Sequence, residues 1–189
     1  MVTVPETAPG RPRGASGAGS RKAILDSAIR VLAREGTHGA RVEEIAAEAG
    51  VSLGLLNYHF GNRRSLLRVA LIAGLEQRPS FAGASLEEML TSALRASERG
   101  ATGWWRIRQE ALRIAAFDPE LRSAATETTA AWTEEISAHL PDGHSTSAMA
   151  GLIVALVDGL SQRVSSGIVS VRAAEHLLEE ALSHLLGGE

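Results

Sequence analysis

The residue types that carry out catalysis or bind metals are sparse and scattered in this chain. Its 189 residues include no Cys, which excludes disulfides, iron–sulfur clusters, thiol catalysis and Cys-based zinc sites. The six His lie apart, and His176 and His184 do not have the spacing of paired metal ligands. The sequence has no glycine-rich phosphate loop, HExxH segment or nucleophile elbow. We therefore expect no catalytic residue, no metal ligand and no cofactor, and we interpret the protein as a non-enzyme.

The distribution of charge indicates a different kind of chemistry. The formal net charge is −3, but residues 1–68 hold ten Lys and Arg against six Asp and Glu. Residues 69–189 hold nine basic and sixteen acidic residues. The first part can therefore approach a polyanion that the second part would repel.

Within the basic part, residues 42–60 have the pattern of a helix-turn-helix. Ala46 is small, as needed where two helices approach closely. Gly50 follows four residues later, where the chain turns sharply and a residue without Cβ meets no steric penalty. Val51 and Leu56 supply apolar side chains between the helices. The second helix of such a motif lies in the DNA major groove, with its N-terminal residues facing base edges.

Leu53 supports this interpretation. It is an apolar residue expected on the outer face of a short helix that Ser52 caps. An exposed apolar side chain at that place makes sense where a partner covers it.

The elements that position these residues are all predicted to be helices. Apolar residues recur with helical period from Ser20 onwards, and no alternating run is long enough for a convincing strand. The helices are predicted at residues 20–35, 42–49, 52–60, 62–77, 86–99, 102–117, 119–140, 146–166 and 170–186, with Ser20 as first cap and Gly36 as first break. We predict an all-α protein with a flexible tail (1–19), a helix-turn-helix domain (20–66) and a larger domain (67–189).

Residues 21–68 resemble the DNA-binding domain of the TetR family of transcriptional regulators. The resemblance covers about a quarter of the chain. The residues that carry it are Ile24-Leu25, Glu35-Gly36, Ile45-Ala46, Ala49-Gly50-Val51-Ser52, Gly54, Tyr58-His59-Phe60 and Leu66-Leu67. It implies an N-terminal three-helix DNA-binding domain, followed by a C-terminal helical bundle that binds a ligand and dimerises.

The resemblance also implies which residues read bases. Leu53, Gly54 and Asn57 stand where relatives contact base edges. Leu53 can pack on thymine methyl groups, Gly54 lets the backbone approach closely, and Asn57 can pair with an adenine edge. Phe60 is expected in the core, and Arg68 is expected on a solvated helix face.

Phosphate contacts are implied for a second group of residues. Ser52, Tyr58 and His59 stand where relatives hydrogen-bond phosphates, and Arg63 where relatives carry a Lys. Arg41 replaces the usual Thr, so it cannot accept a capping hydrogen bond but can bind phosphate directly. The alternative for Tyr58 and His59 is packing within the small domain.

Polar residues interrupt the apolar helix stripes of the larger domain. Thr128 and His139 lie on the same predicted helix face as Trp132, and Trp105 belongs to another apolar face. Such groups need partners from the protein or from a ligand. We expect a pocket between the central helices for a mainly hydrophobic or amphipathic small molecule; the alternative is that these residues only fill the core.

Asp158 is the only charged residue within residues 149–160. One interpretation is that it contacts the ligand. The other is that its carboxylate pairs with an Arg such as Arg163 or Arg113.

The last two helices have the pattern of a dimer surface. Small and apolar residues line one face of each: Gly151, Ala155 and Gly159, then Ala174, Leu177, Leu178, Ala181 and Leu185. Two such pairs of helices would form a four-helix interface about a two-fold axis, which matches a palindromic operator. The alternative is that both stripes pack within one chain.

Together these features predict a ligand-responsive homodimeric regulator, a repressor that a small molecule releases from double-stranded operator DNA. The longest apolar stretch, residues 149–157, is too short to span a bilayer, and no signal segment opens the chain, so we expect a cytoplasmic protein without a membrane partner. The alternatives are an activator, a non-specific DNA binder, or a small-molecule-binding or catalytic bundle with a non-functional DNA-binding head.

Overall fold

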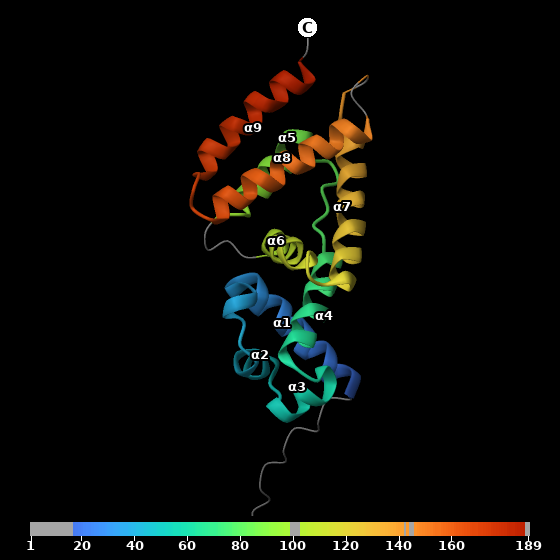
Figure 1. Ribbon diagram of the computed structural model, residues 1–189, viewed down its shortest axis with the longest axis vertical. Coiled ribbons are helices and arrows are strands. Elements are labelled where there is room, and N and C mark those ends of the chain that lie inside the picture. The colour runs from blue at the N-terminus through green and yellow to red at the C-terminus, as the bar shows by residue number, and fades with distance from the viewer. Residues whose placement is uncertain (1–16, 99–102, 142, 144–145, 188–189) are drawn as a thin grey trace, which may run out of the picture.

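The computed structural model describes residues 17–98, 103–141, 143 and 146–187. Over these residues the chain forms helices and no strand, as the sequence predicted. The helices are α1 (Gly17–Gly39), α2 (Val42–Ala49), α3 (Leu53–Phe60), α4 (Arg63–Glu76), α5 (Leu86–Arg95), α6 (Trp104–Ala115), α7 (Pro119–His139), α8 (Ser147–Ser165) and α9 (Val171–Leu186). The molecule is elongated, with α1–α4 forming a head at one end and α5–α9 a body at the other (Figure 1).

Most predicted helix boundaries agree with the structure to within a few residues, and two differ for clear reasons. The first helix begins at Gly17, so Ser20 lies buried inside it instead of capping it. Gly36 leaves the helical conformation, with φ 69° and ψ 177°, and a further turn continues to Gly39. The last three residues of the predicted tail (1–19) are helical, because α1 begins at Gly17. The rest of this tail and the predicted break at Gly100 lie outside the described residues.

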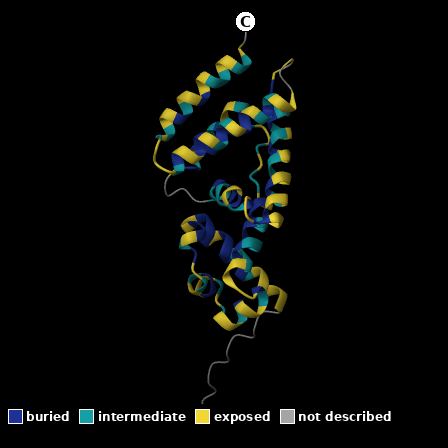
Figure 2. Ribbon diagram, in the orientation of Figure 1, coloured by how far each residue is buried: buried dark blue, intermediate teal, exposed yellow. Residues whose placement is uncertain are grey.

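The hydrophobic core of the head includes residues from the body. Its buried side chains from α1–α4 pack against the buried residues Ile107 and Ala111 of α6 and Leu121 and Ala125 of α7. Figure 2 shows that α1 carries many of the buried residues of this region. One face of α6 and the first turns of α7 are therefore structural parts of the head.

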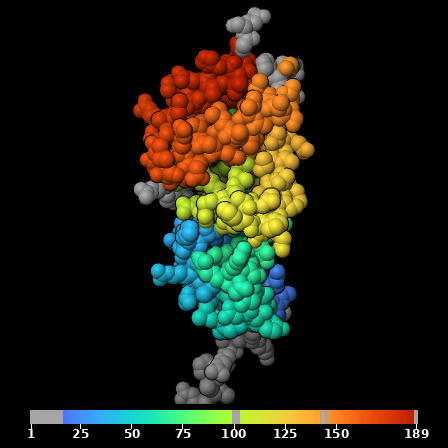
Figure 3. All heavy atoms as spheres, in the orientation of Figure 1, coloured from blue at the N-terminus to red at the C-terminus, as the bar shows by residue number. Residues whose placement is uncertain are grey.

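A second core holds the body together. It contains Trp105 of α6, Trp132 of α7 and the inner faces of α5, α8 and α9. In Figure 3 the surfaces of α6 and α7 lie between the head and the two last helices. Ala174 and Leu178 are fully buried in this core, so part of the predicted dimer stripe packs within the chain.

Helix α8 is the one helix in the described ranges that is long and apolar enough to cross a membrane by length and composition. Ile153 and Val157 on one of its faces are fully buried in the second core. The apolar composition of α8 is that expected of a core helix.

We predict that Gly74→Ala destabilises the protein. A Cβ at this buried position of α4 would lie 2.9 Å from Cγ2 of Ile107 and 3.6 Å from Cγ2 of Ile29. Ile107 is β-branched and fully buried, so it cannot move aside cheaply. The expected loss in the free energy of unfolding is about 1–3 kcal/mol, despite the helix propensity of Ala.

Urea denaturation measures this effect, with Gly54→Ala as the control. A Cβ at Gly54 would meet only Oγ of Ser52, at 3.9 Å. A Gly74→Ala variant as stable as the wild-type protein would show that α4 and α6 are not tightly packed.

Candidate nucleic-acid interface and effector region

The helix-turn-helix is built by backbone geometry at three consecutive residues. Gly50 ends α2 in the left-handed conformation, with φ 67°. The N–H of Val51 donates to the carbonyl oxygen of Ala46 at 3.0 Å. Ser52 then caps α3 by accepting a hydrogen bond from the N–H of Leu55 at 3.2 Å. A sharp turn therefore connects the two helices, as the sequence predicted.

Ion pairs with α1 fix the position of α2. Glu48 accepts a hydrogen bond from Nε of Arg30 at 2.6 Å, and Glu44 pairs with Arg34. The hydrogen bond from Arg30 holds the pKa of Glu48 below its ordinary value. Arg41 precedes α2 and makes no side-chain capping bond, which confirms that its guanidinium does not replace the usual cap.

The residues predicted to read bases lie on the outer face of α3. Leu53 is 42% exposed, and Gly54 and Asn57 are also exposed. Leu56 and Phe60 form the opposite, buried face, so the prediction that Phe60 is a core residue is confirmed. None of the three outward residues is covered by the body.

The residues predicted to bind phosphate differ in how available they are. Tyr58 is 82% exposed, and the hydroxyl of Ser52 keeps its own proton free to donate after accepting the capping bond. His59 is half-buried, and its Nε2 is shielded from solvent without a hydrogen-bond partner. A phosphate contact by His59 therefore requires Nδ1 or a rotation of the ring.

Arg63 binds backbone carbonyl groups at the end of α1. Its Nε donates to the carbonyl oxygen of Ala40 at 3.0 Å, and its Nη2 donates to that of Thr37 at 2.5 Å. Arg68 does not lie on a solvated face: it is ion-paired with Glu120 at 3.2 Å and Asp118 at 3.8 Å. The expectation for Arg68 was wrong because α7 packs across α4, which the sequence pattern of α4 alone does not reveal.

A carboxylate links α6 to the end of α1. Oε2 of Glu110 accepts hydrogen bonds from the N–H of Thr37 at 3.2 Å and from its hydroxyl at 2.5 Å. Arg113 donates to the same oxygen at 2.9 Å. Burial alone would raise the pKa of Glu110, but the hydrogen bonds from Thr37 and Arg113 outweigh burial and lower it. The turn that follows Gly36 is thus held by α6.

In the body, aromatic rings fill the space where a ligand pocket was predicted. The ring of Trp132 lies 5.3 Å from that of Trp105 and 5.4 Å from that of Phe81, measured between centroids. Trp132 is fully buried and Trp105 is 5% exposed. Trp104 contacts Trp105 and donates its Nε1 proton to the carbonyl oxygen of Leu75 at 2.9 Å.

The partner of Asp158 is Arg108 of α6, not Arg163 or Arg113. Arg108 is 2% exposed and also donates Nη2 to the hydroxyl of Thr129 at 3.3 Å. Burial raises the pKa of Asp158, and the charge of Arg108 only partly opposes this.

Arg108 and Thr129 were not predicted from the sequence as members of this region. The position of Arg108, four residues after Trp104 and three before Ala111, places it on an apolar helix face. This spacing was the available signal that the side chain is buried.

Two of the predicted ligand-binding residues are satisfied by their own helix. The hydroxyl of Thr128 donates to the carbonyl oxygen of Ala124 at 2.8 Å, and Nδ1 of His139 lies 2.7 Å from that of Glu135. By contrast, Nε1 of Trp132, Oγ of Ser161 and Nε of Arg108 are buried and lack a hydrogen-bond partner. These three atoms, from α7, α8 and α6, are unsatisfied polar groups in the interior.

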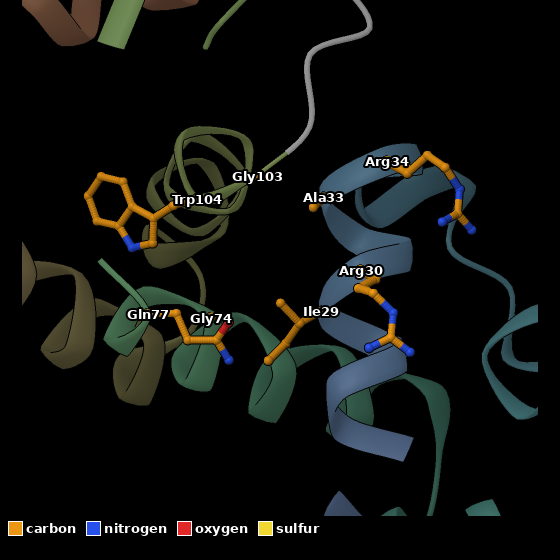
Figure 4. Close-up of a pocket in the computed structure, with 8 residues that line it drawn as sticks. All are labelled: Ile29, Arg30, Ala33, Arg34, Gly74, Gln77, Gly103 and Trp104. Carbon is orange, nitrogen blue, oxygen red and sulfur yellow. The ribbon is translucent and has the colours of Figure 1, made fainter. Parts of the chain in front are cut away.

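A separate cavity of about 460 Å³ lies between α1, α4 and the start of α6 (Figure 4). Its lining residues are Ile29, Arg30, Ala33, Arg34, Gly74, Gln77, Gly103 and Trp104. Because Arg30 and Arg34 are ion-paired with α2, the free polar chemistry of this cavity is limited to groups such as the Gln77 amide.

The comparison with protein families decides what the head is. Residues 24–70 match the family described as bacterial regulatory proteins, tetR family. Residues 24–70 are therefore similar to the DNA-binding domain of this family. The match includes α2, α3 and the turn between them, and it ends within α4.

The similarity to known proteins extends beyond this domain. It is 36% identical over 112 residues to the HTH-type transcriptional regulator BetI of Rhizobium meliloti, which covers 59% of this chain. The chain spans about half the length of that relative, 48%.

Among solved structures, a TetR-family transcriptional regulator from Rhodococcus sp. is similar with a TM-score of 0.64 and 29% identity, over 89% of this chain and 99% of that one. The multidrug binding protein EbrR complexed with proflavin is similar with a TM-score of 0.65 and 25% identity, over 88% and 99%.

We predict that Glu110→Gln lowers stability in a pH-dependent way. Because the pKa of Glu110 is lowered on folding from 4.5, its carboxylate stabilises the fold above that pH and loses this effect as the pH falls through the lowered pKa. At pH 7 the expected loss is about 1–3 kcal/mol. The difference in the free energy of unfolding between the variant and the wild-type protein should become smaller towards pH 3.

Thermal or urea denaturation across this pH range checks the prediction, with the exposed Glu134→Gln as control. A stability difference that stays constant from pH 7 to pH 3 would refute the role of the ionised carboxylate.

Proposed function

We propose that this chain is a dimeric, ligand-responsive transcriptional regulator, and specifically a repressor that a small molecule releases from a palindromic operator. The observation that carries the proposal is the outer face of α3. Leu53 and Tyr58 are exposed at 42% and 82% on a helix held by a capped turn and a buried opposite face. Apolar and aromatic groups exposed at this position fit a surface that DNA covers.

The proposed DNA contacts divide into two groups. Leu53, Gly54 and Asn57 would read base edges in the major groove. The remaining contacts would position the protein on phosphates, through Arg41, Ser52, Tyr58, His59 and Arg63. Arg63 already donates to two carbonyl groups at the end of α1, so a phosphate bound to its remaining N–H groups would be linked through Arg63 to the end of α1.

The proposed dimer surface lies on the outer faces of α8 and α9. Leu152 and Leu177 are 58% and 42% exposed, and Gly151 and Gly159 leave open space beside α8. Small residues on this face allow a second copy to approach closely. A two-fold axis there would place two α3 helices to read two half-sites.

The proposed effector region lies between α6, α7 and α8. Its walls are Trp105, Thr128, Trp132, His139 and Asp158, together with Arg108. The unsatisfied N–H of Trp132 and hydroxyl of Ser161 favour a mainly apolar molecule that carries a hydrogen-bond acceptor. Trp132 is fully buried, so the rings around it would move apart to admit the molecule. The similar structure of EbrR with proflavin supports small-molecule binding by this fold.

Helix α6 offers a route from the effector to DNA. Arg108 reaches Asp158 in the body, while Glu110 holds Thr37 in the head. An effector that shifts α6 would therefore change the position of the head relative to its partner in the dimer. The shift in DNA affinity equals the difference in effector affinity between the two arrangements.

Repression follows from occupancy, because a dimer that covers promoter DNA blocks access to it. We infer that this protein acts in the cytoplasm, where operator DNA is located, and that it is not an enzyme. Operator binding and release require no covalent bond to be made or broken.

Binding to DNA from the upstream region of its own gene tests the proposal, with a scrambled duplex of equal length as control. We expect Leu53→Ala and Tyr58→Phe to weaken binding to the native duplex roughly tenfold each, corresponding to about 1.4 kcal/mol. Leu53→Ala should also relax the sequence preference. The exposed Phe117→Ala, which lies outside α3 and outside the proposed dimer surface, serves as the control variant and should bind the native duplex like the wild-type protein.

Fluorescence anisotropy over a series of salt concentrations measures these affinities. Affinity for the native duplex should fall steeply with salt. Binding to both duplexes that is equal, weak and unchanged by either variant would refute the assignment of α3 as the recognition helix.

A further inference from the structure

A cavity of about 370 Å³ lies on the seam between the head and the body. It is bounded by the end of α1, the first half of α4, the end of α6 and the start of α7. Its lining residues are Thr37, His38, Arg63, Arg64, Leu67, Arg68, Leu71, Arg113, Ile114, Asp118 and Leu121. This volume is within the range of small-molecule sites. The cavity is separate from the proposed effector region, with which it shares no lining residue.

The lining is amphipathic. Leu67, Leu71 and Leu121 are buried and Ile114 is half-buried, so the floor is apolar. The polar part of the lining is dominated by four arginines, and Asp118 is the single carboxylate in it.

The charges of these arginines are only partly neutralised. Arg68 pairs with Asp118 and Glu120, and Arg113 pairs with Glu110. The other two lack a carboxylate partner. Arg63 donates to two backbone carbonyl groups, which carry no net charge, and Arg64 has no ion pair or hydrogen bond within the described residues.

Arg68 adds a second observation. Its Nε is buried and has no hydrogen-bond partner, although its Nη1 reaches two carboxylates. A buried guanidinium N–H without an acceptor is costly, and a ligand oxygen in the cavity would satisfy it.

We propose that this cavity binds a small amphipathic anion, a carboxylic acid with an apolar chain or ring. The carboxylate lies between Arg64 and Arg68, which suit it because a guanidinium donates in a fork that matches two oxygens. The apolar part lies on Leu67, Leu71 and Ile114. A bare inorganic anion would leave this apolar floor uncovered.

The position of the cavity gives the ligand a consequence for regulation. The bound anion contacts α4 of the head and α6 of the body at once, so it holds one arrangement of the two parts. This consequence rests on the proposed regulator function, whereas binding itself does not. A direct binding measurement without DNA therefore separates failure of the site from failure of the proposed function.

Isothermal titration of the full chain with octanoate tests the site, and octylamine provides the same apolar chain with the opposite charge. We expect one saturable octanoate site per chain and at least tenfold weaker binding of octylamine. Arg64→Glu should weaken octanoate binding at least tenfold, and Ile114→Trp should abolish it by filling the cavity. Arg172→Glu, an exposed arginine on α9 in the body, should leave it unchanged.

Circular dichroism checks that each variant is folded. If Ile114→Trp does not fold, Arg64→Glu still tests the site, because Arg64 is exposed and its substitution should not disturb the core. Three outcomes would overturn the proposal. These are no octanoate binding at millimolar concentration, equal binding of octylamine, or octanoate binding that Arg64→Glu leaves unchanged.

Discussion

Burial of one face of α6 against the head is the constraint on which the rest of this structure depends. Ile107 is fully buried and packs where α4 offers Gly74 in place of a side chain. On the same helix Glu110 holds the turn at Thr37, and Arg108 faces the other way to pair with Asp158. Because α6 supplies buried residues to both cores, a change in the body that moves α6 must alter the packing of the head.

This shared packing gives the polar groups of the interior a coherent interpretation. A buried ion pair is seldom justified by stability alone, because the cost of removing two charges from water offsets much of their attraction. Arg108 and Asp158 instead join α6 to α8, and α7 and α8 also carry the buried, unsatisfied atoms of Trp132 and Ser161. The seam between head and body holds a second group of incompletely paired cations, among them Arg64. Both places are suited to ligands that act through the position of α6.

The sequence predicted the helices and the helix-turn-helix well, because both depend on local signals. Gly50 and Ser52 specify their turn and cap without help from distant residues, and the outward position of Leu53 follows from helical period. What it could not predict are contacts between helices far apart in the chain. The pairs Arg108 with Asp158 and Arg68 with Glu120 depend on how α6, α7 and α8 cross, and periodicity within one helix carries no information on that crossing. The contacts of the predicted DNA and effector residues with their ligands remain predictions.

Native-state hydrogen exchange at increasing denaturant concentration tests most directly whether α6 belongs to the head. If α6 is part of the head's core, the slowest amides of α1, α4 and α6 exchange through one shared opening, with the same free energy and denaturant dependence. Exchange of the α1 and α4 amides through a separate opening of lower free energy, with α6 still protected, would contradict the account. It would show that the head folds independently of the body.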